Sequence, residues 1–168
     1  SAKKTMMLAQ QLYEGVSLGK TSVGLITYMR TDSVRLAEVA IAEIRDYIKQ
    51  NFGSEFCPAK ENHYSTKKNA QDAHEAIRPT DVTRTPAAVK EFLSRDQFRL
   101  YQLVWKRFIA SRMQPARYET TSVKIAAGQY RFTVAASKIV FEGFRSVYTE
   151  AGETKEENNV LLKGLDMD

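Results

Sequence analysis

Tyr28 and Arg30 are the first residues whose types and spacing could do chemistry, and they lie in the run Tyr28-Met29-Arg30-Thr31-Asp32-Ser33. We predict a short strand over 24–28, which places the phenol and the guanidinium on the same side. A phenol, with a pKa of about 10, attacks phosphorus only if its oxyanion is stabilised. An arginine can supply that charge and clamp two phosphate oxygens. A structural tyrosine beside a surface arginine would give the same pattern.

A second group follows in Gln71-Asp72-Ala73-His74-Glu75-Ala76-Ile77-Arg78-Pro79. We predict a short helix over 70–77 that Pro79 ends. On a helix, His74 and Arg78 are four residues apart and share a face, so both could reach one phosphate. The alternative is that Arg78 pairs with Glu75, or that His74 lies in solvent.

The pattern of apolar residues predicts three more helices and one long one before residue 115. They are expected over 5–14, 33–51, 85–93 and 94–113. The expected helix starts are Thr5, Ser33, Thr85-Pro86 and a capping box of Ser94 with Gln97, and Gly15 is expected to end the first helix. The last helix carries an apolar stripe, interpreted as core rather than as a surface for stacking bases: Phe98, Tyr101, Trp105, Phe108 and Met113.

After Pro115 the apolar period changes from helical to alternating, which predicts strands joined by a turn at Gly128-Gln129. The fold class is therefore α+β. A mainly helical domain with a winged-helix-like start is expected over 1–115, followed by a partial antiparallel β domain over 116–168. Two or three strands seldom stand alone. Four apolar side chains should therefore be more exposed than their types warrant: Val123, Ile125, Phe132 and Val134. We also expect the chain to self-associate at high concentration.

Composition and charge limit the classes of protein to which the chain can belong. Of 168 residues, 43% are apolar and 27% charged, as in folded globular chains, and there is no apolar run of the length that a membrane helix needs. A single cysteine, Cys57, closes no disulfide within the chain and favours the cytosol. Residues 1–145 hold 23 Lys or Arg against 14 Asp or Glu, whereas 146–168 hold 2 against 6. The basic part is compatible with a polyanionic partner, or with a lysine-rich surface and no such partner.

Together, the runs 24–33 and 73–79 resemble the active-site domain of bacterial type IA DNA topoisomerases, with His74 lying 46 residues after Tyr28. The segments 6–15 and 100–105 match in the same order, so the resemblance extends from about Lys4 to about Phe144. Met29 is more similar to the topoisomerase I branch than to the topoisomerase III branch, where proline is usual.

The resemblance implies a mechanism and roles for single residues. Tyr28 would attack a backbone phosphorus of DNA, forming a 5′-phosphotyrosine and releasing a 3′-hydroxyl, without ATP. Arg30 would stabilise the charge on phosphorus, and His74 would contact DNA near the cleavage site. Thr27, Asp32 and Arg78 match motif positions and are further candidates for DNA binding.

The resemblance also implies what lies elsewhere. The family's acidic Mg²⁺ cluster belongs to a separate domain, so we expect these residues to hold no cofactor and the isolated chain to neither cleave nor relax DNA. The expected partners are single-stranded or negatively supercoiled DNA and the remaining domains of the same enzyme, not a membrane. The expected location is the cytoplasm, with the nucleoid.

Two alternatives make different use of the same residues. A non-catalytic DNA-binding module would use 5–14 as a recognition helix and 23–28 as a wing, with no need for Tyr28. A tyrosine recombinase or type IB topoisomerase also forms a phosphotyrosine. Its Arg, His and Lys residues precede a late tyrosine, however, whereas Tyr28 comes first here.

Overall fold

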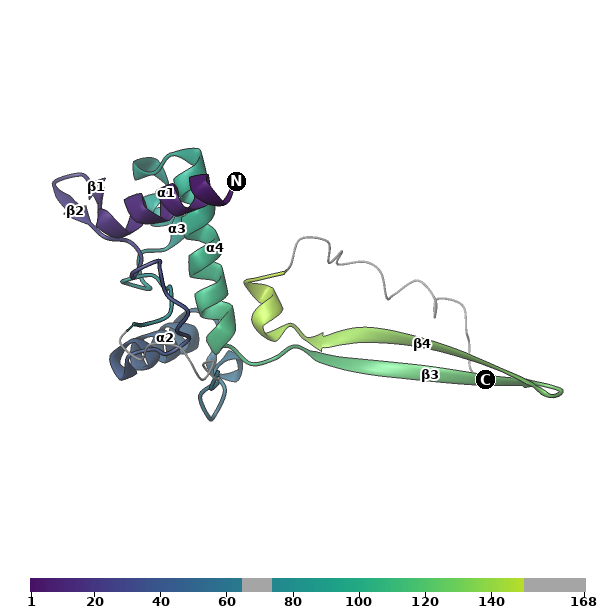
Figure 1. Cartoon of the computed structure of the whole chain (residues 1–168). Coiled ribbons are helices and arrows are strands. Elements are labelled where there is room, and N and C mark those ends of the chain that lie inside the picture. The colour runs from purple at the N-terminus through teal and green to yellow at the C-terminus, as the bar shows by residue number, and fades with distance from the viewer. Residues whose placement is uncertain (65–73, 150–168) are drawn as a thin grey trace. The chain divides into compact units, whose positions relative to one another are not determined.

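The computed structural model describes residues 1–64 and 74–149 of the chain (Figure 1). The chain forms two compact units, Ser1–Gln114 and Pro115–Asp168. The first unit contains α1 (Ala2–Glu14), β1 (Val16–Leu18), β2 (Thr21–Val23), α2 (Glu38–Asn51), η1 (Ser54–Phe56), α3 (Pro86–Val89), η2 (Lys90–Phe92) and α4 (Arg95–Arg112). The second contains β3 (Arg117–Ala127), β4 (Tyr130–Phe141) and η3 (Gly143–Ser146). This mixture of helices with antiparallel strand pairs is the predicted α+β class.

Helix α1 begins three residues earlier than the sequence pattern predicts. The Ser1 hydroxyl, not that of Thr5, accepts the capping hydrogen bond, from the N–H of Lys4. The C-terminal end is as predicted, because Gly15 adopts a φ of 138°, which suits glycine. The hairpin β1–β2 then reverses the chain direction, with Val16 opposite Val23.

The strand predicted over 24–28 is wrong. Strand β2 ends at Val23, and the next segment makes only one isolated antiparallel bridge, between Ile26 and Pro79. Leu25 and Ile26 are nevertheless buried, so this segment is an inner part of the unit. The wing that the non-catalytic alternative assigns to 23–28 is therefore wrongly placed, since the exposed hairpin is β1–β2.

Helix α2 begins at Glu38, and the prediction that Ser33 caps it is wrong. The Ser33 hydroxyl instead accepts from the N–H of Arg35, and the Ser33 N–H donates to the Thr31 hydroxyl. These local bonds hold 31–35 in a turned conformation and delay the helix. The buried face of α2 carries Ala40, Ile44 and Ile48.

Helix α4 is the element that joins the first unit together, and it contacts α1, α2 and α3 (Figure 1). Its predicted capping box of Ser94 and Gln97 is confirmed by hydrogen bonds in both directions, and so is the predicted cap of α3 at Thr85. Four members of its apolar stripe are buried, as predicted: Tyr101, Trp105, Phe108 and Met113.

The second unit is a long antiparallel hairpin. Gly128, with a φ of 60°, and Gln129 form its turn as predicted, and Ile125 lies opposite Phe132. These two side chains are 54% and 59% exposed, which confirms their predicted exposure, and Val123 and Val134 are half-buried. The assignment of 116–168 to the start of a larger β domain stays a prediction. Among the described residues, no helix has the length and apolar character to cross a membrane.

Candidate active site

The segment that carries Tyr28 lies against the last turn of α1. The N–H of Leu25 donates to the carbonyl of Leu12 over 2.7 Å. Gly24 makes this approach possible, because a Cβ there would lie 2.6 Å from the carbonyl oxygen of Tyr13. The backbone therefore brings the end of α1 and the start of the site into direct contact.

The ring of Tyr28 contacts two other aromatic rings. Tyr13 of α1 approaches it edge-on, with centroids 5.4 Å apart and an interplanar angle of 66°. His74, from the second sequence cluster, lies 5.4 Å from the same ring at 37°. Tyr28 and His74 are both half-buried. The structure thus brings together the nucleophile candidate and the candidate histidine.

The segment 74–80 is not helical, so the predicted helix is wrong over its described part and lies otherwise outside the described residues. Its backbone groups bond to other segments instead. The Thr27 hydroxyl accepts from the N–H of Arg78 at 2.9 Å and donates to the carbonyl of Ala76 at 2.8 Å. The N–H of Ala76 donates to the carbonyl of Arg35. These bonds replace the helical ones and fix the backbone that follows His74.

Glu75 joins this segment to α2 and to Arg78. One carboxylate oxygen accepts from the N–H of Ala37, which precedes α2, over 2.6 Å. The other pairs with the Arg78 guanidinium at 3.0 Å, which confirms the alternative in which Arg78 pairs with Glu75. Arg78 also donates to the carbonyl of Pro79. Its buried Nε has no partner among the described residues.

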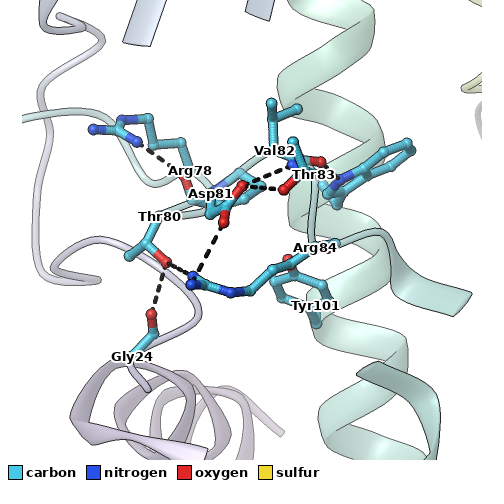
Figure 2. Close-up of polar contacts among 10 residues, drawn as sticks. Gly24, Arg78, Thr80, Asp81, Val82, Thr83, Arg84 and Tyr101 are labelled. Atoms are coloured by element: carbon cyan, nitrogen blue, oxygen red, sulfur yellow. Dashed lines mark hydrogen bonds and ion pairs between the residues drawn. The ribbon is translucent and has the colours of Figure 1, made fainter. Parts of the chain in front are cut away.

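Residues 80–84 form a turn that bonds to the backbone of the Tyr28 segment at Gly24 (Figure 2). The Thr80 hydroxyl donates to the carbonyl of Gly24 at 2.7 Å, and the Arg84 guanidinium reaches Thr80 and the carboxylate of Asp81. Burial alone would raise the pKa of Asp81. Hydrogen bonds from the side chain and backbone of Thr83, together with the charge of Arg84, outweigh burial, so the pKa lies below its usual value.

Helix α4 holds this turn with two polar side chains. The Tyr101 hydroxyl donates to the carbonyl of Arg84 at 2.6 Å, and the Trp105 indole N–H donates to the carbonyl of Val82 at 3.0 Å. Burial raises the pKa of the Tyr101 hydroxyl. A continuous set of contacts therefore runs from α4 through the turn and Gly24 to the Tyr28 segment.

Arg30 and Asp32 differ from Thr27, Tyr28 and His74. Both are exposed, and within 1–64 and 74–149 neither has an ion pair or a side-chain hydrogen bond to another described residue. Met29 between Tyr28 and Arg30 is buried and anchors the segment. These two exposed charges follow Tyr28 closely in the sequence and are available to a ligand.

Sequence reasoning missed Tyr13 as a neighbour of Tyr28, and it missed the bond from Ala37 to Glu75. Tyr13 reaches Tyr28 only because the β1–β2 hairpin turns the chain back, and Glu75 reaches Ala37 across 38 residues. The paired glycines Gly15 and Gly24 around a short polar loop were the available signal for the first contact.

Described residues do not fit a magnesium site. No group of three or more His, Cys, Asp or Glu side chains within 1–64 and 74–149 could hold a metal ion. Two carboxylates of this region are already engaged, Glu75 with Arg78 and Asp81 with Arg84.

Comparison with known proteins gives a consistent result. A family model described as DNA topoisomerase matches residues 1–166. DNA topoisomerase 1 of Xylella fastidiosa (strain Temecula1) is 52% identical over 158 residues, 92% of this chain and 19% of that protein. DNA topoisomerase 1 of Rickettsia felis is 48% identical over 166 residues, 96% of this chain and 21% of that protein. The chain thus spans about a fifth of these relatives.

A solved structure is also similar. The structure of full-length topoisomerase I from Thermotoga maritima has a TM-score of 0.76 and 43% identity to this chain, of which it covers 94%. The matched part is 26% of the Thermotoga chain. At this identity the likeness extends beyond the fold to the sequence.

Proposed function

The chain belongs to the DNA topoisomerase family, and we propose that it is the part of a type IA enzyme that carries the nucleophilic tyrosine, Tyr28. The observation that carries the proposal is the contact of the Tyr28 and His74 rings, which joins the two sequence clusters at one place. In the whole enzyme, the activity is relaxation of negatively supercoiled DNA through a transient break in one strand.

The reaction is an exchange of one phosphodiester for another. The phenol oxygen of Tyr28 forms a bond to a backbone phosphorus, and the bond from that phosphorus to the 3′-oxygen breaks. The phenol loses its proton, and the departing 3′-oxygen gains one. The product is a 5′-phosphotyrosine, and attack by the 3′-hydroxyl reverses the step after a strand has passed. Because the number of ester bonds is unchanged, the exchange needs no ATP.

Side chains around Tyr28 divide into charged and supporting groups. We assign to Arg30 the stabilisation of charge on the five-coordinate phosphorus, which its exposure and its position two residues after Tyr28 support. His74 and Asp32 contact the DNA near the break. Thr27 and Arg78 match the motif too, but their hydrogen bonds within the protein support a role in holding the backbone.

Magnesium belongs to the proposal only through the rest of the enzyme. Because the described residues do not fit the ion, no step is assigned to it here. By the family resemblance the acidic cluster lies in another domain. We therefore propose that the isolated 168-residue chain does not cleave or relax DNA. Relaxation of supercoiled plasmid by the purified chain would contradict this.

The partners are DNA, the other domains of the enzyme and, for the isolated chain, a second copy. The exposed apolar side chains of β3 and β4, Ile125 and Phe132 among them, support self-association at high concentration. Light scattering over a concentration series tests it. A monomeric mass throughout would exclude it.

The function is tested in the complete enzyme that contains this chain. Incubation with single-stranded DNA should give a covalent complex that survives denaturation. Tyr28→Phe should abolish the complex but leave DNA binding intact, because only the nucleophilic oxygen is lost. Tyr130→Phe, at a 63% exposed tyrosine of β4, is the matched control and should behave as the wild type. An undiminished complex in Tyr28→Phe would exclude the proposed function.

A further inference from the structure

We propose that Tyr13 is a positioning residue for the cleavage reaction, and this rests on the proposed function of Tyr28. Its ring and that of His74 lie against the Tyr28 ring and fix the direction in which the Tyr28 hydroxyl points. The two centroid distances are both 5.4 Å. Tyr13 acts on the nucleophile through this ring contact and does not itself react.

The exposure of Tyr13 separates this role from core packing. The buried side of α1 is formed by Ala9 and Leu12, whereas Tyr13 is 41% exposed. The fold of the helix therefore does not depend on a ring at this position. An interplanar angle of 66° with Tyr28 is the edge-to-face arrangement that aromatic pairs favour.

The backbone holds Tyr13 where this contact can form. Its carbonyl oxygen lies directly beneath Gly24, and the neighbouring Leu12 carbonyl accepts from Leu25. At the same end of α1, the Gln11 side chain accepts a hydrogen bond from Gln97 of α4 at 3.0 Å. These contacts fix the backbone of Tyr13, from which its ring reaches Tyr28.

The consequence for the reaction is preorganisation. An in-line attack on phosphorus requires the phenol oxygen to lie opposite the leaving 3′-oxygen. A phenol that rotates freely spends little time in that position. Ring contacts with Tyr13 and His74 restrict the rotation of the Tyr28 side chain. The ring of Tyr13 is what does this, so its hydroxyl is dispensable.

Three variants of the complete enzyme test this: Tyr13→Leu, Tyr13→Phe and Met7→Ala. Met7, 51% exposed on the same helix, is the matched control. We expect Tyr13→Leu to slow single-turnover cleavage of a single-stranded oligonucleotide roughly tenfold at saturating DNA, with the half-saturating DNA concentration unchanged. Tyr13→Phe should restore the rate to within about twofold of the wild type, and Met7→Ala should not change it.

A second readout does not depend on activity. In the 168-residue chain, the ring signals of Tyr28 in NMR spectra should carry ring-current shifts from Tyr13. Tyr13→Leu should remove these shifts, and Tyr13→Phe should keep them. Unchanged Tyr28 signals in Tyr13→Leu would show that the contact is absent and would overturn the proposal.

The outcomes separate this inference from the proposed function. If the wild-type enzyme cleaves DNA and Tyr13→Leu cleaves it at the same rate, only the positioning role is overturned. A Tyr13→Phe rate as low as that of Tyr13→Leu would also overturn the positioning role alone. If the wild-type enzyme forms no covalent complex through Tyr28, the proposed function fails and the positioning role fails with it.

Discussion

The region around Tyr28 and the β3–β4 hairpin are built in opposite ways. Around Tyr28, contacts join residues far apart in the sequence, as when Thr27 bonds to Ala76 across 49 residues and Thr80 bonds to Gly24 across 56. In the hairpin, every strand pairing spans the single turn at Gly128, and regular backbone bonds hold it together. The site has little regular structure, whereas the hairpin has much.

The difference teaches where each region is vulnerable. In the site, single polar side chains satisfy buried backbone groups, so losing one leaves an unpaired donor or acceptor. In the hairpin, side-chain substitutions leave the backbone hydrogen bonds in place. Its weakness is that it exposes apolar side chains to solvent. Trp105 is the one tryptophan and lies in the first unit, so its fluorescence reports on the unfolding of the unit that contains the site.

Alanine at Gly24 and alanine at Gly128 should have very different effects on the stability of the first unit. A Cβ at Gly24 would lie 2.6 Å from a backbone oxygen, whereas at Gly128 nothing lies within 4 Å. We expect Gly24→Ala to lower the free energy of unfolding by about 2–3 kcal/mol, measured by denaturant titration with Trp105 fluorescence. Gly128→Ala is strained by the positive φ of 60° at that position, but the strain falls on the hairpin of the second unit. The free energy that Trp105 reports for the first unit should therefore be unchanged. Equal effects of both variants would refute the contrast.

Thr27→Val against Thr120→Val compares two threonine hydroxyls. The change at Thr27 keeps the shape but leaves the N–H of Arg78 and the carbonyl of Ala76 without their partner. We expect the free energy of unfolding to fall by about 2 kcal/mol, measured by the same denaturant titration. Among the described residues, the exposed Thr120 hydroxyl bonds to Ser137 alone, and its loss should not change the Trp105 transition. A loss below about 0.5 kcal/mol at Thr27 would mean that its two bonds do not hold the site.

Glu75→Gln against Glu119→Gln compares two carboxylates. In Glu75→Gln, the new amide oxygen would still accept from Ala37, but the charge that pairs with Arg78 would be lost, and the Arg78 side chain is only 15% exposed. We expect a loss of about 1 kcal/mol and a change in the chemical shifts of His74, followed by NMR. Glu119 is exposed on β3, and its change should alter neither. Unaltered His74 signals in Glu75→Gln would show that the Glu75–Arg78 pair does not fix the backbone beside His74.

Asp81→Asn tests the smallest effect, through pH. A carboxylate whose pKa is lowered in the folded state adds stability above its unfolded pKa of about 3.9, and this is lost as pH falls through the folded pKa. The stability advantage of wild type over Asp81→Asn should therefore be constant above about pH 5 and shrink as pH falls below it. Because the carboxylate is 35% exposed, we expect a change of at most about 0.5 kcal/mol. An advantage that grows on acidification would contradict the direction.

The sequence predicts the local features of the fold well. The capping box of α4, the Gly15 stop of α1 and the Gly128-Gln129 turn are all present, because each depends on residues a few positions apart. The buried stripe of α4 follows from its helical spacing in the same way.

The errors lie where distant residues supply the bonds. The strand over 24–28 and the helix over 70–77 both fit their local patterns. In the structure, however, the Thr27 hydroxyl and the Arg35 carbonyl bond to the backbone of Ala76. The backbone bonds of 25–27 go to Arg78 and Thr80 instead of to a strand. Ser33 resembles a helix cap, but a distant carboxylate, Glu75, supplies the acceptor just before α2. Nothing local in the sequence contains these contacts.

The central claim is tested most directly by finding which residue carries the DNA. The covalent complex of the complete enzyme is digested with trypsin, trimmed with nuclease and analysed by mass spectrometry. Cleavage after Lys20 and Arg30 gives the peptide 21–30, in which Tyr28 is the one tyrosine. We predict a nucleotide linked through its 5′-phosphate to Tyr28 in this peptide. A nucleotide on another peptide, such as 5–20 with Tyr13, or one linked through its 3′-phosphate, would contradict the account.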